Sequence, residues 1–428
     1  MKQLSNEQLR IISLSDQLYS AAKNFNVLKQ VAWPTSIKDT FFKQGAKKLP
    51  EPSYEIVEQA SVLAICASVR TQLGDSVIDQ WFKRQCSAIE NTAKMLQSLG
   101  TKDFYHYSSK LYGTPKDHLN DEASTSLDLA LTFNSLLDPI KLIDIGAPAP
   151  ACHLAETVAE KMIVAVQEMF KDQAPRIEIV DELSANALAG RERIRIRRQA
   201  HFTDKDVAQL IHHEAYIHVA TLLNGYNQPH LKVLTSVHPG STKTQEGLAV
   251  FAEFISGSME LDRMRRLADR VIAIQMAIDG ADFIDVYQYF LGQTQNQDQS
   301  FENARRVFRG GVISGGAPFT KDIVYLDGLL RIQNFLQVMI KTGRADCLRL
   351  LFVGRLDIED IPALAELYQL GLCQPPQYLP PWAKDMRFLL TYLMYSSFLS
   401  NIDMSKVESH YRNMLNDIPT LVLSKPIV

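Results

Sequence analysis

The sequence has few cysteines, a small net charge and no long apolar run, and each shortage excludes a class of protein. Its five cysteines are scattered and odd in number, without a C-x-x-C pair, so the 428-residue sequence predicts reduced thiols and no disulfide framework. The formal net charge of −3 gives no global field that would favour nucleic acid or an anionic membrane. The apolar runs SVLAICASV and LLTYLMYSSFL are shorter than the roughly 20 residues of a membrane span. With no secretory signal at the N-terminus, these features predict a cytoplasmic protein without a nucleic-acid or membrane partner.

Several common catalytic motifs are also missing. No G-x-S-x-G is present, which leaves an α/β-hydrolase triad without its nucleophile. The segment HPGSTKT lacks the glycine that precedes the lysine of a phosphate-binding loop. The glycines of RGGVISGGAP do not have G-x-G-x-x-G spacing, so this segment is interpreted as a tight or flexible loop.

What the sequence does contain is apolar spacing typical of helices, interrupted by a short stretch of strand pattern. RIEIV (176–180) and RERIRIRR (191–198) alternate as strands do. We therefore expect an α+β fold, mostly helical, with a small and mainly antiparallel sheet before the helix that carries the candidate metal site. Residues 1–165 are expected to form a mainly helical region and residues 166–428 the catalytic region, packed as one unit. Further helices are expected at 203–225, 245–257, 259–279, 282–291, 300–308 and 321–342, with exposed loops at 292–300 and in QPPQYLPPW.

The second of these strands has a basic face. Arg193, Arg195 and Arg197 alternate with the apolar Ile194 and Ile196. One interpretation is a half-buried strand whose charged face is solvated. The other is a basic rim that receives an acidic substrate.

The segment LIHHEAYIHVA (210–220) contains the strongest chemical pattern, with His213, Glu214 and His218 close together. Two histidines with an adjacent glutamate are typical of zinc hydrolases, which need three protein ligands, an open position for water and a carboxylate beside that water. A five-residue spacing, however, turns the second imidazole by about 140° around an α-helix. We therefore predict a π-bulge between the histidines. Glu246, near the start of the next helix, is the expected third ligand.

The family resemblance begins at QEGLA (245–249) and extends over nearly the whole chain. It includes LYGTPKDH, DELSANALAGRERIRIRR, H-E-x-x-x-H, RRVFRGG and GGAPFTKDIVYLDG. These ordered motifs resemble the flavohemoglobin expression-modulating QEGLA motif proteins, which are related to the eukaryotic microtubule-associated tyrosine carboxypeptidases. The resemblance implies a gluzincin-like zinc metallopeptidase in which His213, His218 and Glu246 hold one zinc ion and Glu214 is the general base. It implies a peptide or protein C-terminus as substrate, although nothing in the sequence indicates tubulin.

Other side chains are candidates for the remaining tasks of such an enzyme. Tyr325, with Lys321 one helical turn earlier, is the expected donor to the tetrahedral oxyanion. A carboxypeptidase also needs a cation for the terminal carboxylate; Arg306, Arg309 and Lys321 are the choices, and Arg309, beside two glycines, is preferred. His238 is a candidate substrate-facing residue.

Two alternatives stay open at this level. An aminopeptidase or dipeptidase would need carboxylates for the substrate amine in place of a cation. A regulatory or binding protein with a non-catalytic metal site, affecting gene expression indirectly, is the alternative from another class. The three predicted ligands argue against a regulatory or binding protein, because structural zinc sites usually have four protein ligands and no open position. Glu253, on the same helix face as Glu246, could orient a ligand histidine.

Overall fold

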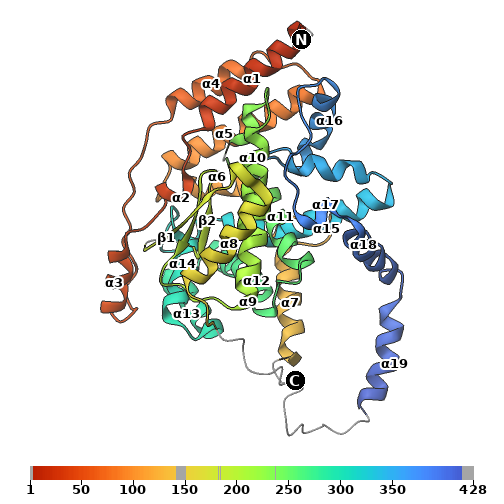
Figure 1. Ribbon diagram of the computed structural model, residues 1–428. Helices are drawn as coiled ribbons and strands as arrows, with labels where there is room; N and C mark the ends of the chain where they lie inside the picture. The colour runs from red at the N-terminus through yellow and green to blue at the C-terminus, as the bar shows by residue number, and fades with distance from the viewer. Residues whose placement is uncertain (1–2, 141–150, 182, 184, 237, 417–428) are drawn as a thin grey trace.

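The computed structural model describes residues 3–140, 151–181, 183, 185–236 and 238–416, and most of them are helical (Figure 1). The α-helices are α1 (Asn6–Ala22), α2 (Val27–Gln30), α3 (Thr35–Lys43), α4 (Ala60–Arg70), α5 (Val77–Gln97), α6 (Lys102–Tyr112), α7 (Ser126–Ile140), α8 (Ala155–Phe170), α9 (Asp204–Leu210), α10 (Ala220–Tyr226), α11 (Thr242–Ile255), α12 (Leu261–Ile278), α13 (Phe283–Thr294), α14 (Gln297–Phe308), α15 (Val324–Lys341), α16 (Ile361–Gln369), α17 (Pro381–Lys384), α18 (Arg387–Leu399) and α19 (Met404–Asn416). A π-helix, η2 (Ile211–Val219), joins α9 to α10. The 3₁₀ segments are η1 (Lys171–Gln173), η3 (Lys232–Thr235), η4 (Pro239–Ser241), η5 (Lys321–Ile323), η6 (Ala345–Phe352) and η7 (Ile358–Asp360).

The strand pattern is confirmed, but the predicted direction of pairing is wrong for the longer pair. β1 (Arg176–Val180) pairs in parallel with β3 (Arg193–Arg197), over five residue pairs from Arg176↔Arg193 to Val180↔Arg197. A third strand, β2 (Ala187–Ala189), pairs antiparallel with β3 and gives the order β1-β3-β2. Because the tight turn after β2 reverses the chain into β3, β2 occupies one side of β3 and β1 takes the other.

The helix that carries His213 and His218 begins as predicted. The Thr203 side chain accepts a hydrogen bond from the backbone N–H of Asp206, and the Asp206 side chain accepts one from the backbone N–H of Thr203. The helix continues without a break through α9, η2 and α10 and ends at Tyr226, one residue beyond the predicted Asn224-Gly225 end.

The polar segment 292–300 is not the exposed loop that its composition predicts. α13 extends to Thr294 and α14 begins at Gln297, so only two residues connect them. Gln295 has a left-handed backbone (φ 53°), and the Asn296 side chain accepts a hydrogen bond from Gln299 N–H. The polar residues therefore end one helix and cap the next.

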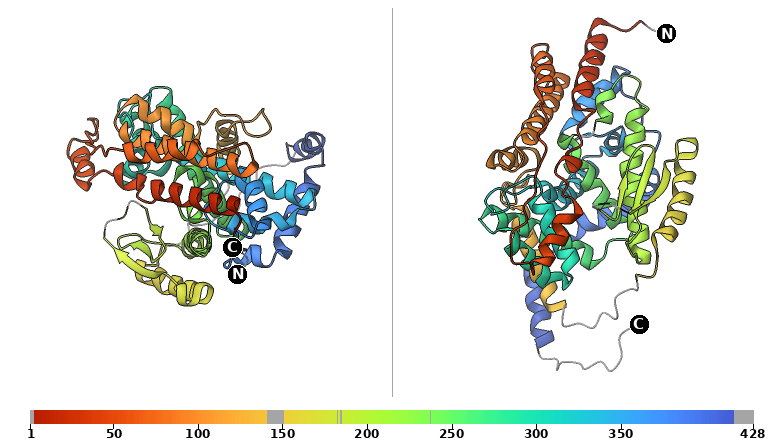
Figure 2. Two further views of the ribbon diagram at one scale, coloured as in Figure 1. Left: turned by 90° about the horizontal axis from the view of Figure 1, so that it is seen from above. Right: turned by 90° about the vertical axis from the view of Figure 1, so that its left-hand side faces the viewer.

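Two apolar cores lie on either side of the helix that carries His213 and His218. α8, the sheet and one face of η2–α10 enclose one apolar cluster, which includes Phe170, Ile194, Ile196 and Phe202. A larger cluster is shared by α1, α4, α5, α11, α15 and the segments up to α18. Figure 2 shows the segment with α8 and the sheet on one side of the protein, apart from the N-terminal and C-terminal helices. The boundary predicted at residue 165 falls inside α8.

α11 and α15 pack closely, and this contact brings the two halves of the candidate site together. By length and composition alone, the segment Lys321–Lys341 could cross a membrane, but half of its apolar window is buried inside the protein. Its buried face includes Val324, Gly328, Ile332 and Leu336, which is the spacing of one helix face against the core.

Candidate metal centre

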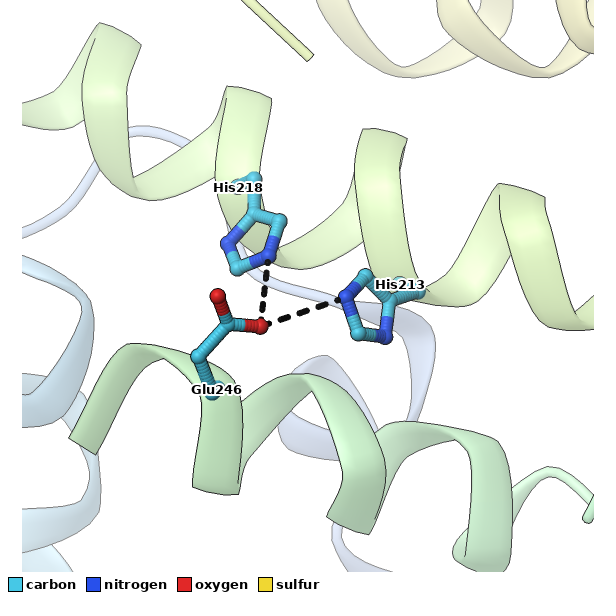
Figure 3. A group of neighbouring side chains, drawn as sticks. All are labelled: His213, His218 and Glu246. Carbon is cyan, nitrogen blue, oxygen red and sulfur yellow. Dashed lines mark ion pairs between the residues drawn. The ribbon is translucent and has the colours of Figure 1, made fainter. Parts of the chain in front are cut away.

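The π-helix places His213 and His218 on the same side, which confirms the bulge predicted from their spacing. Their ring centroids are 4.8 Å apart and the ring planes are nearly perpendicular, at 83°. In Figure 3 both imidazoles point from one helix toward α11. The i→i+5 pattern of a π-helix accommodates the extra residue that an α-helix would not.

Glu246 reaches the two imidazoles from α11. Its Oε2 atom lies 3.5 Å from Nε2 of His213 and 3.6 Å from Nε2 of His218 (Figure 3). One ligand atom from each residue lies within 4.8 Å of the others. Oε2 is buried and has no hydrogen-bond partner among the residues that the structure describes. A buried carboxylate oxygen without a partner, facing two imidazole nitrogens, fits a divalent cation with nitrogen and oxygen ligands.

Glu253, seven residues after Glu246 on α11, holds His213 from behind. Its Oε1 lies 2.7 Å from His213 Nδ1, so Nε2 is the ring nitrogen that faces Glu246. Arg263 of α12 binds the same carboxylate through Nε and Nη2, each at 2.9 Å. Burial raises the pKa of Glu253, but Arg263 and His213 outweigh that effect and lower it to about 2. The carboxylate is therefore ionised, as a partner that orients a ligand histidine should be.

Glu214 follows His213 directly and is 8% exposed. Its Oε2 accepts a hydrogen bond of 2.9 Å from the backbone N–H of Ala189, at the end of β2. The short strand that sequence reasoning missed therefore fixes the orientation of the candidate base. Its signal in the sequence is slight, because three residues of small apolar character do not form a measurable alternation.

Lys321 and Tyr325 lie beside the third ligand. Lys321 Nζ is 3.4 Å from Glu246 Oε1 and 3.4 Å from the Tyr325 hydroxyl. Arg306 Nη2 is also 3.4 Å from that hydroxyl. The structure therefore brings Lys321, Tyr325 and Arg306 to the edge of the metal centre.

Arg309 and His238 do not contact the three ligands in the described part of the chain. Arg309 is 4% exposed, and its guanidinium lies 5.8 Å from the centre of the Phe319 ring. His238 is 3% exposed, and its Nδ1 accepts a hydrogen bond from Gly240 N–H at 3.2 Å. Burial and, secondarily, Arg355 lower the pKa of His238 to about 4, so it is neutral near pH 7.

The basic face of β3 is partly used within the sheet. Arg193 pairs with Glu178 of β1 at 3.0 Å, and Arg197 donates to the Asn186 side chain at 2.8 Å. These two contacts connect β3 to the segments on either side of it.

Three charged residues of the site escaped sequence reasoning: Arg263, Arg270 and Asp322. Arg263 and Arg270 lie seven residues apart on α12, in a stretch of the sequence (LDRMRRLADR) that is typical of a solvated amphipathic helix. Asp322 follows Lys321 and binds Arg306 in a bidentate pair. The seven-residue spacing places both arginines on one helix face, but only the packing shows that this face is turned inward.

Comparisons with known proteins agree with the motif pattern. Residues 39–401 match the family described as microtubule-associated tyrosine carboxypeptidase. Among curated proteins, none matches the chain. One similar solved structure is "the putative lipoprotein from Colwellia psychrerythraea", with 12% sequence identity, a TM-score of 0.38, and coverage of 81% of this chain and 67% of that one.

Proposed function

We propose that this chain, which belongs to the family of microtubule-associated tyrosine carboxypeptidases, is a zinc-dependent carboxypeptidase. The family supports a carboxypeptidase-like activity on a peptide or protein C-terminus. The observation that carries the metal dependence is Glu246 Oε2, a buried oxygen without a described hydrogen-bond partner that faces His213 Nε2 and His218 Nε2.

His213, His218 and Glu246 would hold the metal, with Glu253 fixing the orientation of His213. When bound, zinc supplies a water of lowered pKa and polarises the scissile carbonyl. Three protein ligands leave a coordination position open, as hydrolytic sites require.

Glu214 is the proposed general base. It would take the proton of the attacking water and deliver it to the leaving amine. The Ala189 N–H holds one of its carboxylate oxygens at 2.9 Å, which limits rotation of the side chain and leaves the other oxygen for the proton transfer.

Tyr325 is the proposed donor to the oxyanion. Its hydroxyl lies within 3.4 Å of both Lys321 and Arg306, so two cations favour any negative charge that develops beside it. The family description names tyrosine as the residue removed; for this chain we propose a C-terminal residue whose identity is to be determined.

The first test is the metal content per chain, measured by elemental mass spectrometry on wild type and on Glu246→Ala prepared identically. About one zinc ion per wild-type chain, sharply reduced in the variant, is the expected result. Glu366→Ala, which removes an exposed carboxylate on α16, is the matched control and should keep the metal. A wild-type protein that takes up no zinc, even after zinc is added, would contradict the proposal and favour a regulatory or binding protein.

A further inference from the structure

Three cations surround the ring of Tyr325 at the edge of the metal centre. The Arg270 guanidinium carbon lies 5.3 Å from the ring centre, the Arg306 carbon 6.0 Å and Lys321 Nζ 4.9 Å. They come from α12, α14 and η5, so three separate segments converge on one aromatic side chain. Such a concentration of buried positive charge is costly unless anions balance it.

All three cations face a carboxylate, but only Arg306 and Lys321 lie within hydrogen-bond distance of one. Arg306 binds the Asp322 carboxylate through two nitrogens, one of them at 2.9 Å. Lys321 lies 3.4 Å from Glu246 Oε1. Asp322 is nearly inaccessible to solvent, and its pKa stays well below the ordinary value because Arg306, Arg270 and Lys321 together outweigh the effect of burial.

Arg270 differs from its two neighbours. Its Nε atom is buried and finds no hydrogen-bond acceptor within the described ranges of the chain. The nearest carboxylate oxygen, Asp322 Oδ2, is 3.7 Å away and is already bound by Arg306. Burial, followed by repulsion from Arg306, lowers the pKa of Arg270 to about 9. The Arg270 side chain is nevertheless 14% exposed, so the protein does not enclose it completely.

We infer that Arg270 binds the C-terminal carboxylate of the substrate and thereby determines specificity for a free chain end; this inference rests on the proposed carboxypeptidase function. A guanidinium can bind a carboxylate through two parallel hydrogen bonds, which would satisfy the Nε donor that has no hydrogen-bond acceptor among the described residues.

The position of Arg270 suits this role. In a carboxypeptidase the terminal carboxylate belongs to the residue that directly follows the scissile bond, so its binding group must lie close to the metal centre. Arg270 contacts Tyr325, Tyr325 lies beside Lys321, and Lys321 lies beside the ligand Glu246. These three contacts connect Arg270 to the candidate ligand Glu246, so the guanidinium belongs to the cluster of side chains beside the candidate metal centre.

Arg309, the cation preferred from sequence, also has an Nε without a hydrogen-bond partner in the described residues. It is only 4% exposed, however, and lies over Phe319, which packs with Phe104 and Tyr112 in a separate apolar cluster. A carboxylate could reach Arg309 only if these aromatic side chains moved. Arg270 is partly exposed whereas Arg309 is buried, and this difference favours Arg270.

The test measures binding in a hydrolysis-deficient background, so that chemistry does not obscure recognition. Zinc-loaded Glu214→Gln protein is titrated by calorimetry with short peptides randomised at the last two positions, made either as free acids or as C-terminal amides. A charge-assisted pair of hydrogen bonds predicts that the acids bind roughly 10- to 100-fold more tightly than the amides. Adding Arg270→Gln should reduce this ratio to about one, and Arg270→Lys should restore part of it, since lysine keeps the charge but not the bidentate geometry.

Arg265→Gln is the matched control, because Arg265 lies on the same helix but pairs with Asp262 at the surface. It should leave the ratio unchanged. If both Arg270 variants still bind the acids more tightly than the amides, the inference is overturned while the proposed function stays intact. If Arg309→Gln instead abolishes this preference, Arg309 has the role inferred for Arg270. If the Glu214→Gln protein binds neither acids nor amides and the wild type hydrolyses no peptide, both the proposed function and the inference are refuted.

Discussion

Gly247 and Gly328 are in direct backbone contact where α11 crosses α15. A Cβ atom placed on Gly328 would lie 2.9 Å from both Cα and N of Gly247, closer than a Cβ normally approaches another heavy atom. Gly247 follows the proposed ligand Glu246, and Gly328 lies three residues after Tyr325. The glycine of QEGLA therefore sets how closely the ligand helix approaches the helix that carries Lys321 and Tyr325.

Gly328→Ala is expected to destabilise the protein by about 1–3 kcal/mol, because the new methyl group must push two helix backbones apart. Gly292→Ala is the matched control: Gly292 lies inside α13, and apart from the adjacent backbone of that helix no described atom is within 4 Å of its Cβ position. There the same change should be neutral or stabilise by up to about 1 kcal/mol through helix propensity. Urea unfolding of both variants measures the difference, and equal effects at the two sites would contradict close packing at this crossing.

Glu214→Gln is expected to lower kcat for peptide hydrolysis by roughly 10²- to 10⁴-fold, since glutamine cannot accept the proton of the attacking water. The amide oxygen can still accept the hydrogen bond from Ala189 N–H, so the side chain should keep its place. Zinc content should stay at the wild-type value, which separates this variant from Glu246→Ala. Hydrolysis at the wild-type rate in a pure sample would eliminate Glu214 as the base.

The helix that carries His213 and His218 shows what local sequence determines. Thr203 and Asp206 form the predicted capping box, and the spacing between His213 and His218 correctly indicates a π-helix, because that geometry places both imidazoles on the same side. These features depend on residues within one or two turns of each other. They could therefore be predicted without knowing the rest of the fold.

The surroundings of the ligands depend on long-range packing and could not be predicted in this way. β2 pairs antiparallel along one side of β3, so β1 pairs in parallel along the other side. The three residues of β2 give no clear strand signal, so this arrangement could not be predicted. The charges of Arg263 and Arg270 are typical of a surface helix, yet both point inward, to carboxylates that come from α11 and η5. Nothing in α12 itself indicates these partners.

Glu253→Gln is expected to weaken zinc binding by about 10- to 100-fold without removing any of the three ligands. The neutral amide cannot match the charge-assisted contact of 2.7 Å to His213 Nδ1, and it leaves Arg263 without a balancing anion. Competition with a chromophoric chelator measures the affinity, and Glu260→Gln, at the exposed start of α12, is the control. Unchanged zinc affinity in Glu253→Gln would mean that the orientation of His213 does not depend on this carboxylate.

His238 makes stability depend on pH in a defined window. Its pKa is lowered from 6.5 to about 4 in the folded protein, so between these values the unfolded chain binds more protons. The stability that depends on neutral His238 is complete above pH 6.5 and is lost as the pH falls toward 4.

His238→Asn removes the titrating group but keeps an acceptor near the Gly240 N–H. The difference in unfolding free energy between wild type and variant should therefore shift by about 2 kcal/mol between pH 7 and pH 5, to the disadvantage of wild type at the lower pH. Urea unfolding across this range measures that difference, and the contributions of other titrating groups cancel in it. A difference that does not change with pH would show that His238 is not held neutral by its buried position.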